Sequence, residues 1–120
     1  MYKKKVYPDT MHCCDAMKYA VENPYCAIEY AARYREYFLR DYKSDSGIIV
    51  HNCFHCGARL PESLRSLWFK TLRTEYNIEE PSHNLRKVPK NFRSDIWWKR
   101  LGYEELEDSK YKTCVDRALF

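Results

Sequence analysis

Two groups of cysteines constrain the fold of this chain more than any other feature. Cys53 and Cys56 form a Cys-x-x-Cys turn, and Gly57 after it lets backbone N–H groups approach the sulfurs. Such a knuckle supplies two thiolates to one zinc ion, whereas a structural zinc site takes four tetrahedral ligands. The other two ligands must therefore come from elsewhere, and Cys13 and Cys14 belong to the only other dense group of ligand residues.

The predicted zinc ligands are these four cysteines. They are Cys13, Cys14, Cys53 and Cys56. Neighbouring residues on a helix point about 100° apart, so both members of the adjacent pair can reach one ion only if they precede the helix. His12 is the alternate ligand in place of one of them, and His51 or His55 beside the knuckle is a third choice.

The predicted zinc site is structural. Four thiolates leave no coordination position for water, which a catalytic zinc needs. A thioredoxin-like redox pair would open a helix in a βαβ unit, whereas this knuckle follows a predicted hairpin. Cys26 and Cys114 have no partners by spacing and are interpreted as ordinary buried thiols.

The N-terminus favours a cytoplasmic location. Residues 1–10 carry three lysines and a single Val6, with no apolar h-region of a signal peptide. No run approaches the roughly 18 apolar residues of a membrane span. In a reducing compartment, six cysteines indicate metal more than disulfides.

The remaining pattern predicts an α+β fold, with a small antiparallel sheet packed with three or four helices around the zinc. Tyr37–Tyr42 and Gly47–His51 flank a polar turn and predict a hairpin that ends in the knuckle. Ile28–Tyr30 is the candidate third strand. A helix over Ala27–Leu39 is the alternative, because its residues also have helical propensity.

Three segments predict helices. Thr10–Glu22 is one, with Thr10 or Asp9 as its cap. A second opens at Leu60-Pro61, with proline in the first turn. A third is the short Ile96–Leu101, capped by Ser94-Asp95 and stopped by Gly102. The apolar face of the second helix is Leu64, Leu67, Trp68, Leu72 and Tyr76.

The length of 120 residues is typical of a single domain. Residues 1–9 are expected to form an N-terminal arm, residues 10–102 the zinc-stapled domain, and residues 103–120 a C-terminal extension for which a terminal helix is one interpretation. Residues 77–92 are expected to form a surface loop, because they hold Pro81 and Pro89 and little periodicity.

The combined pattern resembles a family of small uncharacterised bacterial and phage-borne zinc-ribbon-like proteins, over about residues 11–101. The motifs are His-Cys-Cys at 12–14, Cys-x-x-Cys-Gly at 53–57, Leu-Pro at 60–61, Trp-Phe at 68–69, and Trp-Trp at 97–98 after Pro89, Phe92 and Ser94-Asp95. The resemblance implies zinc on the four cysteines and strands within 28–51. The chain departs from the family pattern at Phe54, where proline is usual, and at residues 43–46, where glycines are common.

The preferred function is a protein-interaction module, one form of which is a phage-encoded inhibitor or modulator of a host defence system. No Ser/His/Asp arrangement, glycine-rich phosphate loop or paired-carboxylate motif is visible, so neither an enzyme nor a small-molecule substrate is expected. Trp97 and Trp98 are candidate anchors for a protein partner. Lying about 100° apart, one is expected to hold the core while the other covers a partner; the alternative is that both lie in a broad groove.

The alternative function is nucleic-acid binding. Residues 84–102 hold six basic residues against one acid, Asp95, with Phe92 and Trp97 interleaved. The six basic residues are Arg86, Lys87, Lys90, Arg93, Lys99 and Arg100. A net charge of +4 is nevertheless far from the cationic excess of a dedicated DNA-binding domain.

Overall fold

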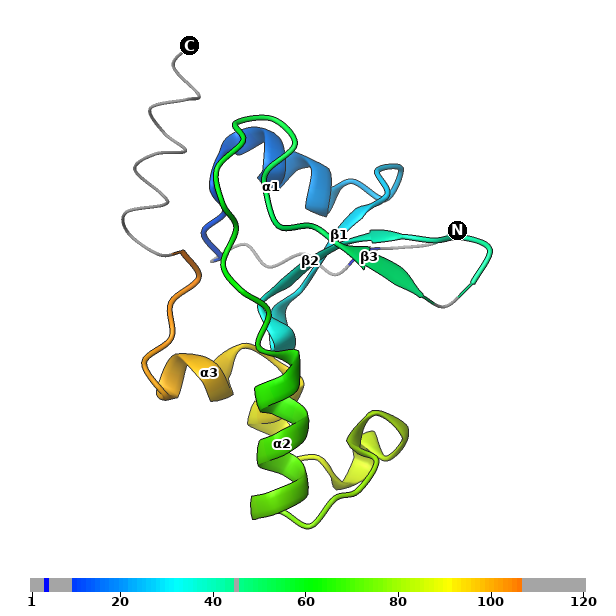
Figure 1. Ribbon diagram of the computed structural model, residues 1–120, viewed down its shortest axis with the longest axis vertical. Helices are drawn as coiled ribbons and strands as arrows, with labels where there is room; N and C mark the ends of the chain where they lie inside the picture. The colour runs from blue at the N-terminus through cyan, green and yellow to red at the C-terminus, as the bar shows by residue number, and fades with distance from the viewer. Residues whose placement is uncertain (1–3, 5–9, 45, 107–120) are drawn as a thin grey trace.

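The computed structural model describes residue 4 and residues 10–44 and 46–106. Its three α-helices are α1 (Asp15–Glu22), α2 (Arg65–Glu75) and α3 (Ile96–Arg100), and its strands are β1 (Ile28–Ala31), β2 (Glu36–Arg40) and β3 (Gly47–Ile49). Short 3-10 helices are η1 (Ala32–Tyr34), η2 (Pro81–His83), η3 (Leu85–Lys87) and η4 (Lys90–Arg93). The α+β class is therefore confirmed (Figure 1). Among the described helices, none is both long and apolar enough to cross a bilayer.

The three strands form one antiparallel sheet in the order β1-β2-β3. Ile28 lies opposite Leu39, and Leu39 lies opposite Ile48. The predicted hairpin and its third strand are confirmed, and the alternative helix over residues 27–39 is wrong. The chain reverses between β1 and β2 through η1, and Arg35 completes the reversal in the left-handed region at φ 49°.

The first core lies between α1, one face of the sheet and the cysteines. Its buried residues are Cys13, Met17, Ala20, Val21, Ile28, Tyr37, Cys53, Cys56, Ala58, Leu60 and Leu106. Met17, Ala20 and Val21 recur at helical spacing and place one face of α1 on the sheet, as predicted. The apolar face of an otherwise polar helix thus brings the segment that precedes it, with its two cysteines, next to the sheet.

The second core lies between α2, α3 and the segment that joins them. Its buried residues are Tyr34, Leu64, Trp68, Leu72, Ile78, Val88, Phe92, Trp97 and Trp98. Leu64, Trp68 and Leu72 come from the predicted apolar face of α2, whereas Tyr76 is 46% exposed. The loop over residues 77–92 contains η2, η3 and part of η4, and it covers this core with Ile78 and Val88.

Both tryptophans of α3 point into the second core, so the expectation that one of them must face outward is wrong. The indole N–H of Trp97 donates to the Arg33 carbonyl at 2.7 Å, and that of Trp98 donates to the Ala32 carbonyl at 2.6 Å. Their exposed fractions are 2% and 0%. Two consecutive backbone carbonyls of η1 accept hydrogen bonds from the two consecutive indoles. Both rings can therefore be buried beside one turn.

An ion pair next to η1 joins the sheet to α2. Glu36 is 2% exposed, and its carboxylate accepts hydrogen bonds from Arg65 at 2.7 and 3.0 Å and from Ser63 at 2.7 Å. Burial by itself raises the pKa of Glu36, but the hydrogen bonds from Arg65 and Ser63 outweigh it and leave the pKa below its usual value. A lowered pKa means that this contribution to stability is present at neutral pH and is lost as acid protonates Glu36.

Two helices begin later than the sequence predicted. α1 begins at Asp15 and not at Thr10, since Cys14 has extended backbone angles of −159° and 167°. α2 begins at Arg65 and not at Leu60-Pro61. The Leu60 N–H donates to the His51 carbonyl at 2.8 Å, and the Leu64 N–H donates to the Tyr34 carbonyl at 2.7 Å.

The third helix agrees with the prediction to within one residue. It ends at Arg100, and Gly102 follows with a positive φ of 96°. Residues 103–106 are not helical, and the rest of the predicted C-terminal extension, Cys114 included, lies outside the described residues. The predicted N-terminal arm also lies outside them, except for Lys4, whose ammonium donates to the carbonyls of Ala20 and Ile28.

The burial of Trp98 predicts a large effect of a small substitution. Trp98→Phe removes the hydrogen bond to Ala32 and leaves a void in a closely packed core, so the free energy of unfolding should fall by about 2–4 kcal/mol. Urea denaturation followed by far-UV circular dichroism measures the change. The matched control is Ile96→Ala in the same helix, where the side chain is 44% exposed and a much smaller loss is expected. Equal losses in the two variants would contradict the assigned role of Trp98.

Candidate metal centre

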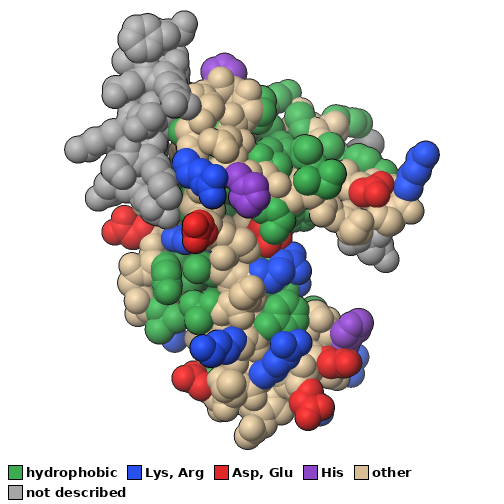
Figure 2. Space-filling model, viewed as in Figure 1, with side chains coloured by type: hydrophobic (Ala, Val, Ile, Leu, Met, Phe, Trp, Pro, Cys, Tyr) green, Lys and Arg blue, Asp and Glu red, His purple; other side chains and the backbone are tan. Residues whose placement is uncertain are grey.

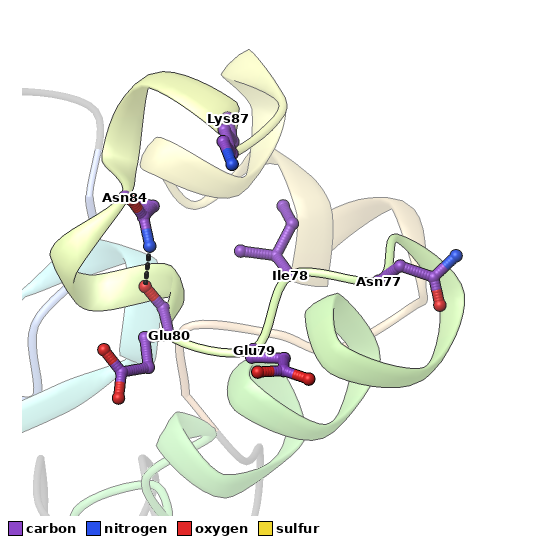
Figure 3. Close-up of a pocket in the computed structure, with 6 residues that line it drawn as sticks. All are labelled: Asn77, Ile78, Glu79, Glu80, Asn84 and Lys87. Carbon is purple, nitrogen blue, oxygen red and sulfur yellow. Dashed lines mark hydrogen bonds between the residues drawn. The ribbon is translucent and has the colours of Figure 1, made fainter.

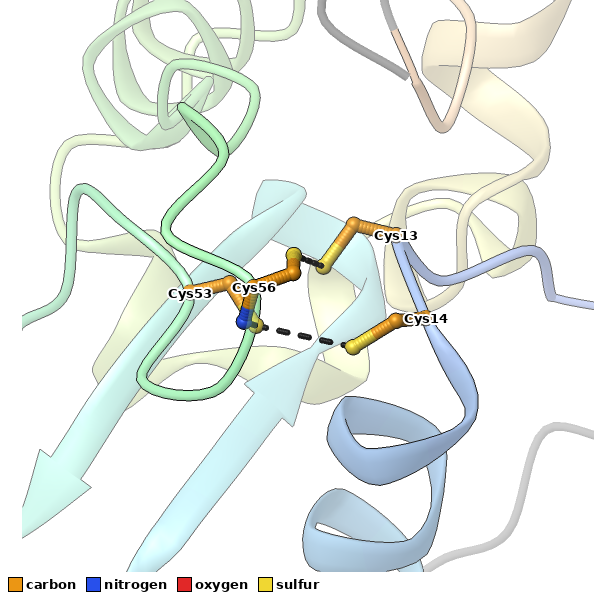
Figure 4. A group of neighbouring side chains, drawn as sticks. All are labelled: Cys13, Cys14, Cys53 and Cys56. Carbon is orange, nitrogen blue, oxygen red and sulfur yellow. Dashed lines mark hydrogen bonds between the residues drawn. The ribbon is translucent and has the colours of Figure 1, made fainter. Parts of the chain in front are cut away.

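Four cysteine sulfurs from two distant segments converge on one point. The Sγ atoms of Cys13, Cys14, Cys53 and Cys56 all lie within 4.8 Å of one another. Cys14 Sγ is 3.6 Å from Cys53 Sγ, and Cys56 Sγ is 3.8 Å from Cys13 Sγ (Figure 4). The predicted ligand set is thus assembled in space, in an arrangement that could hold a metal ion.

The turn after β3 positions two of the sulfurs. The Gly57 N–H donates to the Cys53 carbonyl at 3.0 Å, and Gly57 itself adopts a φ of 78°, which favours glycine. The Cys53 N–H donates to the Ala58 carbonyl at 2.9 Å and closes the turn. The backbone N–H groups of His55 and Cys56 then lie 3.4 and 3.5 Å from Cys53 Sγ, as expected for a knuckle that stabilises a thiolate.

The extended segment before α1 positions the other two sulfurs. Cys14 is the N-cap residue of α1, and its extended backbone lets both Cys13 and Cys14 face the knuckle. The prediction that the pair must precede the helix is confirmed. A regular helix at these positions would direct the two side chains about 100° apart.

The cluster favours one negative charge. A hydrogen bond with Cys13 lowers the pKa of Cys53 to about 5 against the opposing effect of burial, and the N–H groups of Cys56 and His55 lower it further. The same hydrogen bond and burial raise the pKa of Cys13, and burial raises that of Cys14. A bound cation would therefore displace the remaining protons, as thiolate sites require.

Cys56 also takes part in a disulfide in this structure. Metal binding uses thiolates, so it requires the reduced form of Cys56. Cys26 lies outside the group of four sulfurs and is partly buried against the first core.

The histidines considered as alternate ligands lie outside the cluster. His12 is buried, with Nδ1 2.6 Å from the Tyr37 hydroxyl and its ring edge-on to Tyr30. Burial lowers the pKa of His12 to about 4, so the ring is neutral at pH 7. His51 and His55 are exposed, and neither belongs to the group of four sulfurs. The geometry therefore favours the set made of cysteines alone.

The six basic residues predicted to contact a partner do not share one charge environment. All six are exposed. The Lys99 ammonium lies 2.7 Å from Asp95 and 2.5 Å from Glu105, so two carboxylates offset its charge. Arg93 donates to the backbone carbonyls of Val88 and Arg86, which folds it back on its own loop.

Lys87 lines a shallow hollow of about 280 Å³ whose wall also includes Glu79 and Glu80 (Figure 3). The other lining residues are Asn77, Ile78 and Asn84, and Asn84 donates to the backbone carbonyl of Glu80 at 3.2 Å. Neither acid forms an ion pair with Lys87 among the described residues. The basic segment predicted from composition is interrupted at Lys99, where the fold brings Glu105 near.

Two surfaces escaped the interpretation of the sequence. One is the outer end of the β2–β3 hairpin, where Leu39 and Ile48 remain exposed. The other is the outward face of α2, with Phe69 among basic residues. The strand alternation and the spacing of four residues along the helix were the signals that could have identified them.

One family model matches the chain. Its description is a domain of unknown function (DUF6980), and the match spans residues 4–100. The matched region contains all four clustered cysteines and every described helix and strand. The description names neither a zinc ribbon nor a phage protein. No curated protein and no solved structure matches the chain.

Cobalt titration checks the ligand set. Added to the reduced protein, Co²⁺ should produce an intense thiolate-to-metal charge-transfer band, because four sulfurs can surround it. Cys14→Ser should weaken the band and shift the visible spectrum. The control His12→Gln should retain the spectrum of a site with four sulfurs. A shift of the visible d–d bands in His12→Gln would show that this histidine is a ligand.

Proposed function

The chain belongs to the DUF6980 family of domains of unknown function, and we propose that it works as a small protein-interaction module held in shape by one structural zinc ion. The proposed contact surface is the outer end of the β2–β3 hairpin. The observation that carries the proposal is an exposed aliphatic pair, Leu39 and Ile48, on an edge of the sheet.

Zinc is the proposed metal because of the spacing of the sulfurs. A tetrahedron with Zn–S distances of about 2.3 Å has edges of about 3.8 Å. The two sulfur–sulfur distances of 3.6 and 3.8 Å agree with that edge. Sets of four thiolates select zinc or iron. An iron–sulfur cluster would place several atoms between its ligands and need them farther apart than the 4.8 Å limit found here.

A closed shell of four thiolates makes the proposed zinc a structural ion. It would join Cys14 to Cys53, which are 39 residues apart, and Cys13 to Cys56, which are 43 apart. Structural zinc in small domains contributes about 10–16 kcal/mol of apparent binding free energy. That is as large as the whole stability of a typical domain, about 5–15 kcal/mol, so the reduced apo-protein should be largely unfolded.

The hairpin offers a partner both side chains and backbone. Leu39 and Ile48 lie opposite each other on one face and are 43% and 68% exposed, while Ile49 on the other face is 39% exposed. In the described part of the chain, β3 pairs only with β2. An edge strand of this kind can accept a strand from another protein through main-chain hydrogen bonds. Hydrophobic side chains gather over this end of the molecule in Figure 2.

The proposed partner is therefore a protein that supplies an extended, apolar segment. Its strand would continue the sheet beyond β3, and its side chains would cover Leu39 and Ile48. The face that holds these two residues continues into the first core through Ile28, so the contact would extend a packed surface. A phage-encoded inhibitor or modulator of a host defence system would be one form of such a module, and this remains a prediction.

Metal analysis tests the zinc. Protein purified with a reductant should contain one zinc per chain, and a strong chelator should abolish its cooperative unfolding transition, because the two clamped segments separate. The variant Cys53→Ser should lose both the zinc and the folded structure. The matched control Cys26→Ser should retain both, since Cys26 lies outside the cluster. Stoichiometric iron in place of zinc, or a fully folded chelated protein, would contradict the proposal.

Site-specific photo-crosslinking in the native cell tests the hairpin surface. A photoreactive amino acid in place of Ile48 should give one discrete protein adduct, because the partner covers that side chain. The matched control position is Tyr19, which is 66% exposed on α1 compared with 68% for Ile48. It should give no such adduct.

Two further results bear on the same proposal. Nuclease treatment should leave the Ile48 adduct intact, and Leu39→Lys in the same chain should abolish it. An adduct with the mass of two copies of this chain would replace the distinct partner with self-association. Equal adducts at the two positions would contradict a specific surface.

A further inference from the structure

The outward face of α2 carries cations around an aromatic ring. Residues four apart on a helix lie one above the other, so Arg65, Phe69 and Arg73 form one row and Ser66, Lys70 and Thr74 form the next. These six residues line a shallow groove of about 440 Å³. Neither row contains an acidic residue, and lysine and arginine side chains are prominent over α2 in Figure 2.

Phe69 is held rigidly in the middle of this groove. Its ring is half-buried, nearly parallel to that of Tyr34 at a centroid distance of 6.4 Å, and edge-on to Trp68 at 4.9 Å. The Arg73 guanidinium lies 5.2 Å from the Phe69 centroid. Because the second core fixes the ring, it offers a flat apolar surface with little loss of side-chain entropy on binding.

The charges of the groove are only partly balanced. Arg65 is paired with Glu36, so it serves the fold. Arg73 donates to the backbone carbonyl of Glu79, which leaves its positive charge unneutralised at that contact. Lys70 is exposed, and neither Lys70 nor Arg73 forms an ion pair with any described residue. In contrast, Asp95 and Glu105 offset the charge of Lys99 in the C-terminal basic segment.

We propose that this face of α2 binds single-stranded nucleic acid. Lys70 and Arg73 contact successive phosphates, and an unstacked base packs on Phe69 and the Arg73 guanidinium. A basic groove with an aromatic platform is the arrangement that recognises single strands with little sequence preference. An acidic peptide would use the cations but not the half-buried ring.

The size of the groove fits a short stretch of a single strand. From Arg65 to Arg73 the helix rises about 12 Å, the length of two or three nucleotides. A duplex needs an element that enters a groove or spans its backbone over many phosphates, and the row on α2 is too short for that. The proposal is independent of the interaction at the hairpin, because α2 packs on the second core, whereas β3 pairs with β2, which contributes Tyr37 to the first core (Figure 1).

Fluorescence anisotropy with labelled oligonucleotides of about 15 nucleotides, dT and U homopolymers, tests the inference on the reduced, zinc-loaded full chain. Two phosphate contacts predict a slope of about −1.4 in log K against log salt, so affinity should fall roughly sevenfold between 50 and 200 mM salt. The double variant Lys70→Gln, Arg73→Gln should bind about 10-fold or more weakly, with the slope reduced by about 1.4.

Two other variants separate the parts of the site. Phe69→Leu should lower affinity at least about fivefold at both salt concentrations while leaving the slope unchanged, because stacking releases no counterions. The matched control, Arg86→Gln with Lys87→Gln, removes the same charge from η3 and should bind like the unaltered protein. Circular dichroism checks that each variant is folded. If Phe69→Leu is unstable, the double variant at the exposed Lys70 and Arg73 still tests the proposal.

Several results would overturn the proposal. They are no binding at 50 mM salt, equal losses in the α2 and η3 double variants, tighter binding of the matching duplex, and competition by polyglutamate as effective as by unlabelled oligonucleotide. The last result would indicate an acidic protein partner in place of nucleic acid. None of them would affect the crosslinking result expected at Ile48.

Discussion

The convergence of four cysteine sulfurs is the contact on which the rest of the structure depends. Cys13 and Cys14 precede α1, whereas Cys53 and Cys56 follow β3. The cluster therefore joins the segment before α1 to the turn after the sheet. The chain that leaves the knuckle is fastened at once by the hydrogen bond from Leu60 to His51. From there the chain runs toward η1, where α2 begins. The redox state of these thiols should therefore affect where the second half of the chain is placed.

The turn η1 transmits that order to the second core. Its carbonyls at Ala32 and Arg33 accept both indole N–H groups of α3, and Tyr34 accepts the N–H of Leu64 before α2. The buried Glu36 then holds Arg65 at the first turn of α2. Backbone acceptors and one carboxylate within five residues thus orient two helices. As a consequence, the outward face of α2 lies over the second core, whereas β3 extends the sheet beside the first, so the two proposed surfaces can serve different partners.

Elements with a strong local pattern were predicted correctly, and elements decided by remote hydrogen bonds were not. Alternation and β-branched residues identified β2 and β3, and ligand chemistry identified the four cysteines. In contrast, the start of α2 is set by carbonyls of His51 and Tyr34 that no local pattern contains. The geometry of a helix by itself placed Trp97 and Trp98 on different sides. It could not show that η1 presents one backbone carbonyl to each of the two indole N–H groups.

The amino-acid sequence by itself determined the α+β class, the four cysteines that cluster and the position of the hairpin, because spacing and side-chain chemistry are local properties. Only the tertiary structure decided which charges act together. The basic residues of 86–100 are close in sequence, but the fold places Glu105 beside Lys99. Lys70 and Arg73 are fewer and less conspicuous, yet they flank Phe69 on one helical face without an ion pair among the described residues. Electrostatic interaction depends on distance in space, and the order of residues in the chain does not specify that distance.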